Sequence, residues 1–431
     1  MTDEDQASKV LSESESRIFA GDVLVVGAGA SGILAAQRLA EAGFSVTLMD
    51  SVGLGGAQSN HSHGYLHRGH IYGKPSPVLV KALCEGADRW YDLLHAAGVQ
   101  PHNLNSCVGF KSRYTADVAE RAWRRGGLQF EISEPPPGLS SGYLKRCFST
   151  EESTYIFTPW FAYAATQLES VVQVKAEATS LECEGDTITG VVIRQGDSVH
   201  RICARYYVLA AGTGNLPLIS SATNYRGQAL NRVSYMMILA GRQMPNLSLV
   251  VPENDAYGLF LVSRQREAQS YWLVSNYLSY GGADCSENAA VMWLRATARL
   301  LRRATTGLDS AECWGSYSAP KGELRADRNR LDLPSVQSYG FKNVCVAAPT
   351  KLTLCPLLAD DIVRTVTEKF IHPRSRSLAE LGSATLSSKL PVMPELWESA
   401  QLYGMDELRR AIVDPSFLPS RGDATTDVVS I

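Results

Sequence analysis

The 431-residue sequence lacks the features that mark secreted, membrane-spanning and nucleic-acid-binding proteins. Its nine cysteines are scattered, odd in number and never spaced as CxxC, which argues against a disulfide framework or a zinc ribbon. No uncharged apolar run reaches the roughly 20 residues that a membrane helix needs. The acidic, polar residues 1–16 are unlike a signal peptide, and a net charge of -3 gives no reason to expect nucleic acid as a partner. We expect a cytoplasmic protein without a membrane span.

A strand–helix–strand pattern stands near the N-terminus, after a polar stretch over 1–18 that we expect to be disordered. The apolar run that starts at Asp22 and ends in glycine predicts a short buried strand. A helix is predicted over 31–42, closed by Gly43, and a second strand over 44–49 ends at Asp50. This order predicts a parallel α/β unit.

The turn between the first strand and the helix reads Gly27-Ala-Gly-Ala-Ser-Gly32, a GxGxxG fingerprint of dinucleotide binding. Its glycines permit a tight turn and a close approach to pyrophosphate, and the helix N-terminus offers free N–H groups to the phosphates. Asp50 follows Gly32 by 18 residues, where a carboxylate accepts hydrogen bonds from ribose hydroxyls and disfavours the 2′-phosphate of NADP.

Three features favour FAD over NAD as the dinucleotide. A second small-residue loop, Gly55 to Asn60, follows the fingerprint and could follow an extended diphosphate. The strand over 206–211 runs into Gly212-Thr-Gly214, and the strand over 343–348 runs into Pro349-Thr-Lys-Leu-Thr353. The segment at Gly212 lacks a third glycine and a following acid, so we expect no second nucleotide domain. We expect these residues to hold FAD: Gly27, Gly29, Ala30, Ser31, Gly32, Asp50, Ser51, Gly56, Ala57, Ser59, Asn60, Val174, Ala211, Gly212, Thr350, Lys351, Leu352 and Thr353.

Further periodic segments complete the predicted order of elements. Apolar spacing predicts helices over 78–98 and 357–370 and an amphipathic helix near 395–412. Thr158-Pro159 predicts a helix start, with Thr158 as N-cap. Strands are predicted over 171–174 and 188–194, and residues 258–278 predict an antiparallel hairpin.

With these segments in place, the chain resembles the D-amino-acid oxidase superfamily of FAD-dependent oxidoreductases, with L-2-hydroxyglutarate dehydrogenase and glycine oxidase-like proteins among its members. The stretch Ser62-His-Gly-Tyr-Leu-His67-Arg-Gly-His70-Ile-Tyr72, followed by Leu79-Val-Lys-Ala-Leu-Cys84, is similar to a motif of this family. Ala348-Pro-Thr-Lys-Leu-Thr353 is similar to its C-terminal flavin loop. The likeness is patchy over about 20–370 and absent through 215–310, where substrate specificity should lie. Arg68 and Lys351 depart from the family pattern.

The resemblance implies an α/β fold combined with antiparallel β structure. A glutathione-reductase-type Rossmann domain for FAD would be built from residues 19–85, 151–222 and 325–372. A second α+β domain for the substrate would comprise 86–150 and 223–324, and residues 373–431 would form a C-terminal extension with one helix. The implied chemistry is oxidation of a C–N or C–O bond with hydride transfer to flavin N5.

Four of the eight histidines fall between 61 and 70, and the family match places His67 beside the isoalloxazine. We expect it to orient the substrate, shuttle a proton or anchor the flavin, and we expect a lesser role for His70. The competing interpretations are a metal site, which the spacing and the lack of nearby acids or cysteines oppose, and histidines that only bond to the main chain. We expect no metal.

A cation near the flavin would stabilise the negative charge that reduction leaves at N1 and C2=O. Lys351, with the backbone N–H groups of Leu352 and Thr353, is the candidate; alternatively it is a solvated loop lysine. A carboxylate substrate would require an arginine, for which Arg264 and Arg325 are candidates. Tyr277 belongs to an aromatic stretch that could line the substrate or only pack in the sheet.

The sequence therefore predicts an FAD-dependent oxidase or dehydrogenase acting on an amine, an amino acid or a hydroxy acid. Its partners would be that small-molecule substrate and oxygen or a quinone as electron acceptor, with oligomer formation left open. Two alternatives remain. One is a single-component flavin monooxygenase reduced by NAD(P)H. The other is a protein whose FAD takes no part in redox chemistry.

Overall fold

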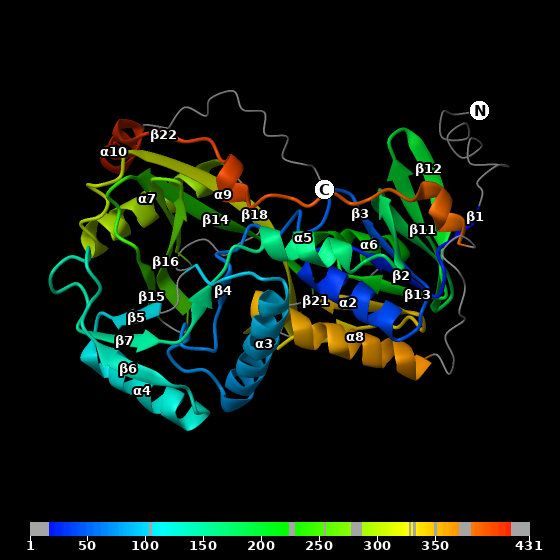
Figure 1. Ribbon diagram of the computed structural model, residues 1–431, viewed down its shortest axis with the longest axis horizontal. Helices are drawn as coiled ribbons and strands as arrows, with labels where there is room; N and C mark the ends of the chain where they lie inside the picture. Colours follow the sequence, from blue (N-terminus) through cyan, green and yellow to red (C-terminus); the bar gives the residue numbers. More distant parts are fainter. Residues whose placement is uncertain are drawn as a thin grey trace.

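The computed structural model describes residues 17–102, 106–223, 229–253, 256–276, 287–326, 329–330, 333–348, 351–369 and 381–414. Two large sheets stand at opposite ends of the molecule, and helix α3 (Pro77–Ala96) lies between them in the view of Figure 1. Residues 381–414 pass from the side of the six-stranded sheet to the far side of the other large sheet (Figure 1).

The first large sheet has six strands in the order β20-β21-β13-β2-β3-β9, and only the edge strand β20 runs antiparallel to its neighbour. On the central strand, Val23 and Val25 face helices α2 (Ala30–Glu41) and α8 (Cys355–Lys369), while Leu24 and Val26 face the opposite core. Burial on both faces explains why the strand is apolar throughout. The strands are β2 (Val23–Val26), β3 (Val46–Asp50), β9 (Val171–Lys175), β13 (Tyr206–Leu209), β20 (Ser335–Gln337) and β21 (Val344–Ala348).

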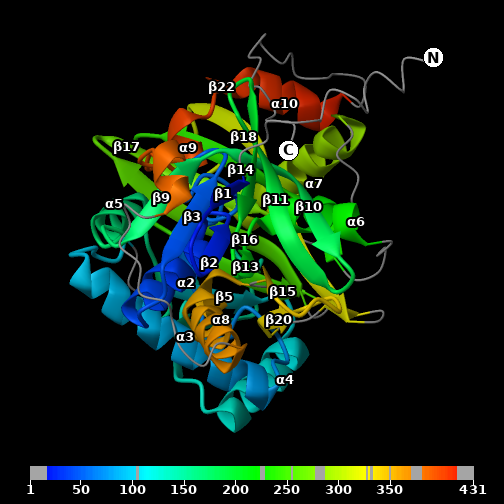
Figure 2. The ribbon, with the colours of Figure 1, turned by 90° about the vertical axis from the view of Figure 1, so that its right-hand side faces the viewer.

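A four-stranded sheet in the order β1-β12-β11-β10 covers the second face of this sheet, beside helix α6 (Asn215–Ala222) (Figure 2). Its strands are β1 (Arg17–Phe19), β10 (Glu177–Glu184), β11 (Thr187–Gln195) and β12 (Ser198–Cys203). The short helices η1 (Gly212–Gly214) and η2 (Leu352–Leu354) follow β13 and β21, and α5 (Thr158–Thr166) precedes β9. Both short helices therefore begin where strands of the parallel sheet end.

The second large sheet has ten strands in the order β19-β18-β14-β17-β16-β15-β5-β7-β6, with β22 paired to β18. Helices α7 (Glu287–Ala304) and α10 (Met405–Val413) pack on one face, and α3 and α4 (Arg113–Gly126) pack on the other. The expected hairpin over 258–278 is confirmed as β16 and β17. The strands are β5 (Ser106–Phe110), β6 (Phe130–Ser133), β7 (Arg146–Thr150), β14 (Ala229–Gly241), β15 (Ser248–Glu253), β16 (Ala256–Arg266), β17 (Gln269–Ser275), β18 (Cys313–Ala326), β19 (Asn329–Arg330) and β22 (Tyr403–Gly404).

Two short strands, β4 (Tyr65–Leu66) and β8 (Ser153–Thr154), pair with each other between the large sheets. Strand β4 belongs to the segment over 61–70, called the histidine segment below. This segment contacts the ten-stranded sheet, because His63 stacks on Phe260 of β16. Both strands are buried.

Three expectations about local structure are wrong. Arg17 and Ile18 belong to β1, which pairs with β12; residues 1–16 lie outside the described part. The helix expected near 395–412 is split into α9 (Leu396–Ser399) and α10, because Tyr403 and Gly404 pair with the edge of β18 instead. Thr158 does not cap α5: the N-cap is Phe157, and its N–H donates to Glu395.

Candidate functional site

The turn over 27–32, called the cofactor turn below, has the backbone that its glycines predict. Gly27 has a φ of +105°, a conformation open mainly to glycine. A Cβ on Gly32 would lie 1.8 Å from the Gly27 carbonyl oxygen, so the first turn of α2 packs directly on the end of β2. The N–H groups of Ser31 and Gly32 stand where a helix offers no carbonyl partner. An anion is the complement of this position.

Asp50 fastens the cofactor turn to the end of β3. Its Oδ2 accepts the Ala28 N–H at 2.7 Å, and its Oδ1 accepts the N–H groups of Val52 and Gly53 at 2.8 and 2.9 Å. Burial raises the pKa of Asp50, and these three hydrogen bonds oppose that shift. A carboxylate has about four acceptor positions, so one remains for a ribose hydroxyl.

The chain over 51–60 folds over the start of α2; it contains the small-residue loop Gly55 to Asn60 and is called the second loop below. Ser59 Oγ accepts the Ala30 N–H at 3.0 Å, and the Gly55 N–H donates to the Ala28 carbonyl at 2.8 Å. Ser51 and Ala57 are exposed, Gly56 and Ser59 are half-buried, and Asn60 is buried with its amide donating to the Met393 carbonyl at 2.5 Å. The second loop is therefore hydrogen-bonded to the cofactor turn.

The remaining residues expected near FAD sit at three strand ends. Val174 on β9 is fully buried beside Met49 of β3. Ala211 is the N-cap of η1, which begins at Gly212, and a Cβ on Gly322 of β18 would lie 2.4 Å from the Gly212 carbonyl carbon. Strand β18 of the ten-stranded sheet therefore touches the parallel sheet here, and the Gly322 N–H donates to Gln58 Oε1 at 3.2 Å.

The flavin loop meets α3 at η2. Trp90 Nε1 donates to the Leu352 carbonyl at 2.8 Å, and a Cβ on Gly86 would lie 2.3 Å from the Thr353 carbonyl oxygen. Lys351 stands just before η2 and is half-buried. Thr350 lies outside the described residues.

His67 is buried, and the charges of two lysines act on its ring. Burial lowers the pKa of its imidazole to about 3; the charge of Glu152 opposes this shift, and the charges of Lys351 and Lys321 add to it. His63 is also buried, and burial with the charges of Arg264 and Lys321 lowers its pKa to about 3. His67 Nδ1 and His63 Nε2 have no hydrogen-bond partner among the described residues. Both rings are therefore neutral at physiological pH.

His70 is held by a carboxylate that sequence reasoning missed, Glu152. The two side chains are buried, with His70 Nδ1 at 2.9 Å from Glu152 Oε1. The same oxygen accepts the N–H groups of Arg68, Gly69 and His70 at 2.5, 3.1 and 3.3 Å, and Oε2 accepts the Tyr65 hydroxyl at 2.5 Å. Burial would raise the pKa of Glu152, but the electrostatic influence and hydrogen bond of His70, together with His67 and the Tyr65 hydroxyl, outweigh it and lower the pKa to about 2.

Arg264 is fully buried and bonds mainly to the main chain. Its Nη2 donates to the carbonyls of His63 and Tyr155, and its Nη1 donates to Thr154 Oγ1 at 3.1 Å and to the Ser263 carbonyl at 3.3 Å. Within the described part of the chain only its Nε has no partner. This arrangement fixes the histidine segment and leaves little of the guanidinium for a substrate carboxylate.

The two lysines whose charges lower the pKa of His67 lie on separate elements. Lys321 lies on β18 next to Gly322, and Lys351 precedes η2. Sequence reasoning missed Lys321, because nothing near it marks a site. Arg325 lies on the same strand with its side chain outside the described part, and Tyr277 lies outside it altogether.

Comparison with known proteins decides the family. The family described as FAD dependent oxidoreductase (DAO) matches residues 22–364. The chain belongs to this family. It is therefore an FAD-dependent oxidoreductase, and FAD is its cofactor.

Individual relatives are distant. The probable FAD-dependent oxidoreductase PA4991 of Pseudomonas aeruginosa is 23% identical over 396 residues, which cover 88% of this chain and 98% of that protein. Its crystal structure matches with a TM-score of 0.65 at 21% identity, over 90% of this chain and 99% of that one. Glycine oxidase from Geobacillus kaustophilus matches with a TM-score of 0.64 at 16% identity, over 86% and 98%. L-amino acid deaminase from Proteus myxofaciens in complex with anthranilate matches at 0.63 and 15%, over 85% and 94%. These likenesses show a DAO-type fold with mixed α/β sheets.

The cofactor turn fits FAD. Its glycines keep side chains away from the place where pyrophosphate would lie, and Gly32 leaves no room for a Cβ. The first-turn N–H groups of α2 would hold the phosphates.

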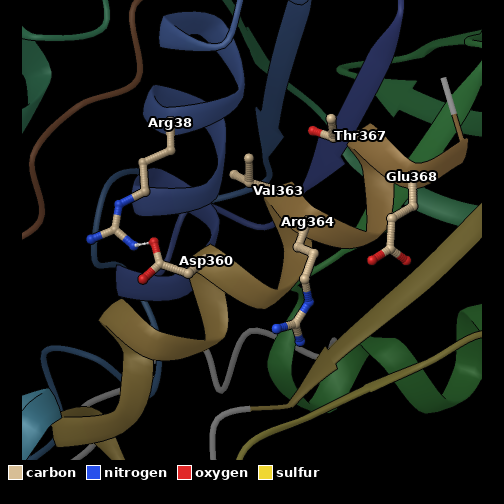
Figure 3. Close-up of a pocket in the computed structure, with 6 residues that line it drawn as sticks. All are labelled: Arg38, Asp360, Val363, Arg364, Thr367 and Glu368. Atoms are coloured by element: carbon tan, nitrogen blue, oxygen red, sulfur yellow. Dashed lines mark hydrogen bonds and ion pairs between the residues drawn. The ribbon is translucent and has the colours of Figure 1, made fainter. Parts of the chain in front are cut away.

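A surface hollow of about 470 Å³ lies elsewhere, between α2 and α8 (Figure 3). Arg38 pairs with Asp360 across it, and none of the residues expected to bind FAD or substrate lines it. Its lining residues are Arg38, Asp360, Val363, Arg364, Thr367 and Glu368. We assign it no part in the reaction.

Within the described ranges, no group of three or more His, Cys, Asp or Glu side chains could hold a metal ion. None of the described helices is both long enough and apolar enough to cross a membrane.

Proposed function

We propose that this enzyme oxidises a C–N or C–O bond in a small molecule that carries a carboxylate, an amino acid or a hydroxy acid. The observation that carries the proposal is the buried His67, whose Nδ1 has no hydrogen-bond partner among the described residues and on which the charges of Lys351 and Lys321 act. The names of the glycine oxidase and L-amino acid deaminase neighbours support the same substrate class.

The proposed cofactor site extends from the cofactor turn to η2. The N–H groups at the start of α2 and the second loop would hold the ADP half, with Asp50 near the ribose. Lys351 and the N–H groups of Leu352 and Thr353 would lie at the flavin. When bound, FAD accepts the hydride that the substrate loses.

Lys321 and Lys351 add positive potential to the proposed substrate site, and the charge of Glu152 opposes it. A positive potential attracts a carboxylate and opposes a nearby ammonium group, which lowers the pKa of the amine. A neutral amine or an alcohol is the form that can give up hydride, so these charges favour the reactive state of either substrate class. They also stabilise the negative charge left after reduction.

His67 and His70 take different parts in this proposal. Because His67 is neutral and its Nδ1 is unpartnered in the described structure, it can accept a hydrogen bond from the substrate nitrogen or oxygen and orient that group. His70 is bound to Glu152 and acts as a positioning residue. We likewise propose Arg264 as a positioning residue rather than a substrate ligand.

We infer a glutathione-reductase-type FAD domain from 19–85, 151–222 and 325–372, and a substrate domain from 86–150 and 223–324. The composition of the sheets supports this division. The six-stranded sheet takes all its strands from the first set, and the ten-stranded sheet takes most of its strands from the second.

Anaerobic reduction of the purified holoprotein tests the function. Amino acids, amines and hydroxy acids are each added without NAD(P)H, and loss of flavin absorbance is followed; at least one acid should reduce the flavin. His67→Gln should slow that step by roughly 10²-fold, as expected when the substrate loses a group that orients it. Reoxidation by oxygen or by a quinone then identifies the acceptor. Bleaching by NADPH with no response to any acid would overturn the proposal in favour of a monooxygenase.

A further inference from the structure

A segment of the C-terminal extension lies against the cofactor site. Residues 390–397, called the C-terminal strap below, lie beyond residues 22–364, which the family description covers. The strap is anchored by Leu390 and Trp397, both buried. Figure 1 shows α9, at its end, between the parallel sheet and the ten-stranded sheet.

The strap is bonded to the second loop along its length. Leu54 pairs with Val392 as in a parallel sheet: the Leu54 N–H donates to the Pro391 carbonyl at 2.8 Å, and the Met393 N–H donates to the Leu54 carbonyl at 3.1 Å. Asn60 Nδ2 donates to the Met393 carbonyl at 2.5 Å. A Cβ on Gly53 would lie 2.3 Å from the Pro391 carbonyl oxygen, so the two backbones touch. The loop that covers the cofactor turn thus has the strap as its outer support.

Glu395 is the buried charged residue of the strap, with 2% of its surface exposed. Its Oε1 accepts the Phe157 N–H at 2.8 Å, and its Oε2 accepts Trp397 Nε1 at 2.6 Å. Both oxygens therefore face N–H donors. The first of these donors belongs to the N-cap of α5, directly after the stretch that pairs with the histidine segment.

Glu395 also lies within electrostatic reach of Arg264. Burial lowers the pKa of Arg264, and the carboxylate of Glu395 is the main opposing influence. Arg264 in turn bonds the carbonyls of His63 and Tyr155. The strap is thereby linked to both parts of the site, to the second loop through the main chain and to the histidine segment through Arg264.

We propose that the C-terminal strap is a clamp that retains FAD, with Glu395 as its positioning residue. The clamp rests on the FAD site proposed above. It holds the second loop over the cofactor turn and, through Arg264, keeps the histidine segment facing the flavin.

The variant Glu395→Gln tests the clamp with almost no change in volume. Glutamine has one acceptor oxygen and an NH₂ donor, so it must turn that donor toward either Phe157 N–H or Trp397 Nε1–H. The dissociation constant of FAD, measured by quenching of flavin fluorescence on titrating apoprotein, should rise by about tenfold or more, the effect of losing one charge-assisted hydrogen bond. Glu398→Gln, an exposed glutamate on α9, is the matched control and should change it by less than about twofold.

Amide hydrogen exchange of the wild-type protein gives a second test that does not depend on the variant folding. Because coupling between two events is reciprocal, a strap that strengthens FAD binding must itself be protected by FAD. Exchange of the Leu54, Met393 and Leu396 N–H groups should slow when FAD is added, and by more than exchange in α10.

Two outcomes overturn the clamp. One is an unchanged FAD dissociation constant in folded Glu395→Gln, even if the apoprotein is less stable. The other is equal protection of the strap and α10. Either result leaves the proposed oxidation standing if the wild-type flavin is still reduced by an acid substrate, so the two proposals fail separately.

Discussion

Removing the carboxylate of Glu152 should loosen the histidine segment more than any other single change there. This carboxylate accepts five hydrogen bonds, four of them from residues 68–70 and one from Tyr65. Each bond to a charged acceptor is worth about 1.5–3 kcal/mol, but bonds that share one group do not add. A buried donor that loses its acceptor costs about 1–3 kcal/mol, and Glu152→Ala leaves several such donors, so it should lose about 3 kcal/mol or more of stability.

Glu152→Gln should cost less, because its amide can keep most of the geometry. Its oxygen can still accept the three main-chain N–H groups, while its NH₂ can donate to the Tyr65 oxygen, since a hydroxyl also accepts. The loss is then mainly that of charge, which roughly halves hydrogen-bond strength. With the pKa lowered from 4.5 to about 2, the ionised state of Glu152 contributes about 3 kcal/mol.

Urea denaturation of the apoprotein, followed by far-UV circular dichroism, measures both variants. The contribution of an acid with a lowered pKa is complete above its unfolded value of 4.5 and is lost as pH falls toward about 2. The gap between wild type and Glu152→Gln should therefore shrink below about pH 4.5. Glu151→Gln, an exposed neighbour, is the matched control. A loss under about 1 kcal/mol for Glu152→Ala, or a gap that does not narrow with acid, would refute the reasoning.

Three further predictions concern the cofactor turn, the histidines and the flavin. Gly32→Ala places a Cβ 1.8 Å from a main-chain oxygen and should abolish FAD binding in titrations, whereas Gly73→Ala, with nothing within 4 Å, should not. Between about pH 6.5 and pH 4 the apoprotein should lose roughly 1.4 kcal/mol of unfolding free energy per pH unit for each buried histidine that protonates only on unfolding, and acid titrations monitored by circular dichroism should show it. These histidines are His61, whose pKa burial lowers to about 4, and His63 and His67, whose pKa values burial lowers to about 3. Lys351→Met should lower the two-electron reduction potential of the flavin by about 30 mV in a dye-coupled titration. The same substitution at the exposed Lys81, Lys81→Met, should leave the potential unchanged.

The parts of the site that are close together in the sequence were predictable, because the spacing of their residues indicates both their structure and their function. The cofactor turn, α2 and Asp50 occupy neighbouring positions in the chain, and the period of the apolar residues fixes strand and helix. The hairpin β16–β17 was predictable for the same reason. The role of Asp50 was only partly predictable: its bonds to Val52 and Gly53 depend on the path of the chain after β3.

The anchors of the histidine segment could not be predicted, because each depends on a contact over a long stretch of chain. Glu152 and His70 are separated by 82 residues, and Glu395 and Phe157 by 238. Nothing in the neighbourhood of Glu152 distinguishes it from Glu151, which is exposed. Arg264 ends a run of apolar strand residues, so its type predicts exposure while its position in β16 buries it.

Charge near the proposed site is divided between two tasks, and the fold accounts for the division. The histidine segment has only the two residues of β4 in a strand, so most of its N–H and C=O groups find no sheet partner and need other ones. The buried side chain of Glu152 accepts hydrogen bonds from N–H groups of this segment, and the buried side chain of Arg264 donates to the His63 carbonyl. Lys321, within β18, and Lys351, at the N-cap of η2, by contrast carry charges that act on the neutral His67. Substitutions of the anchors should therefore change stability first and catalysis second, whereas substitutions of the two lysines should change flavin potential and substrate affinity with little effect on folding.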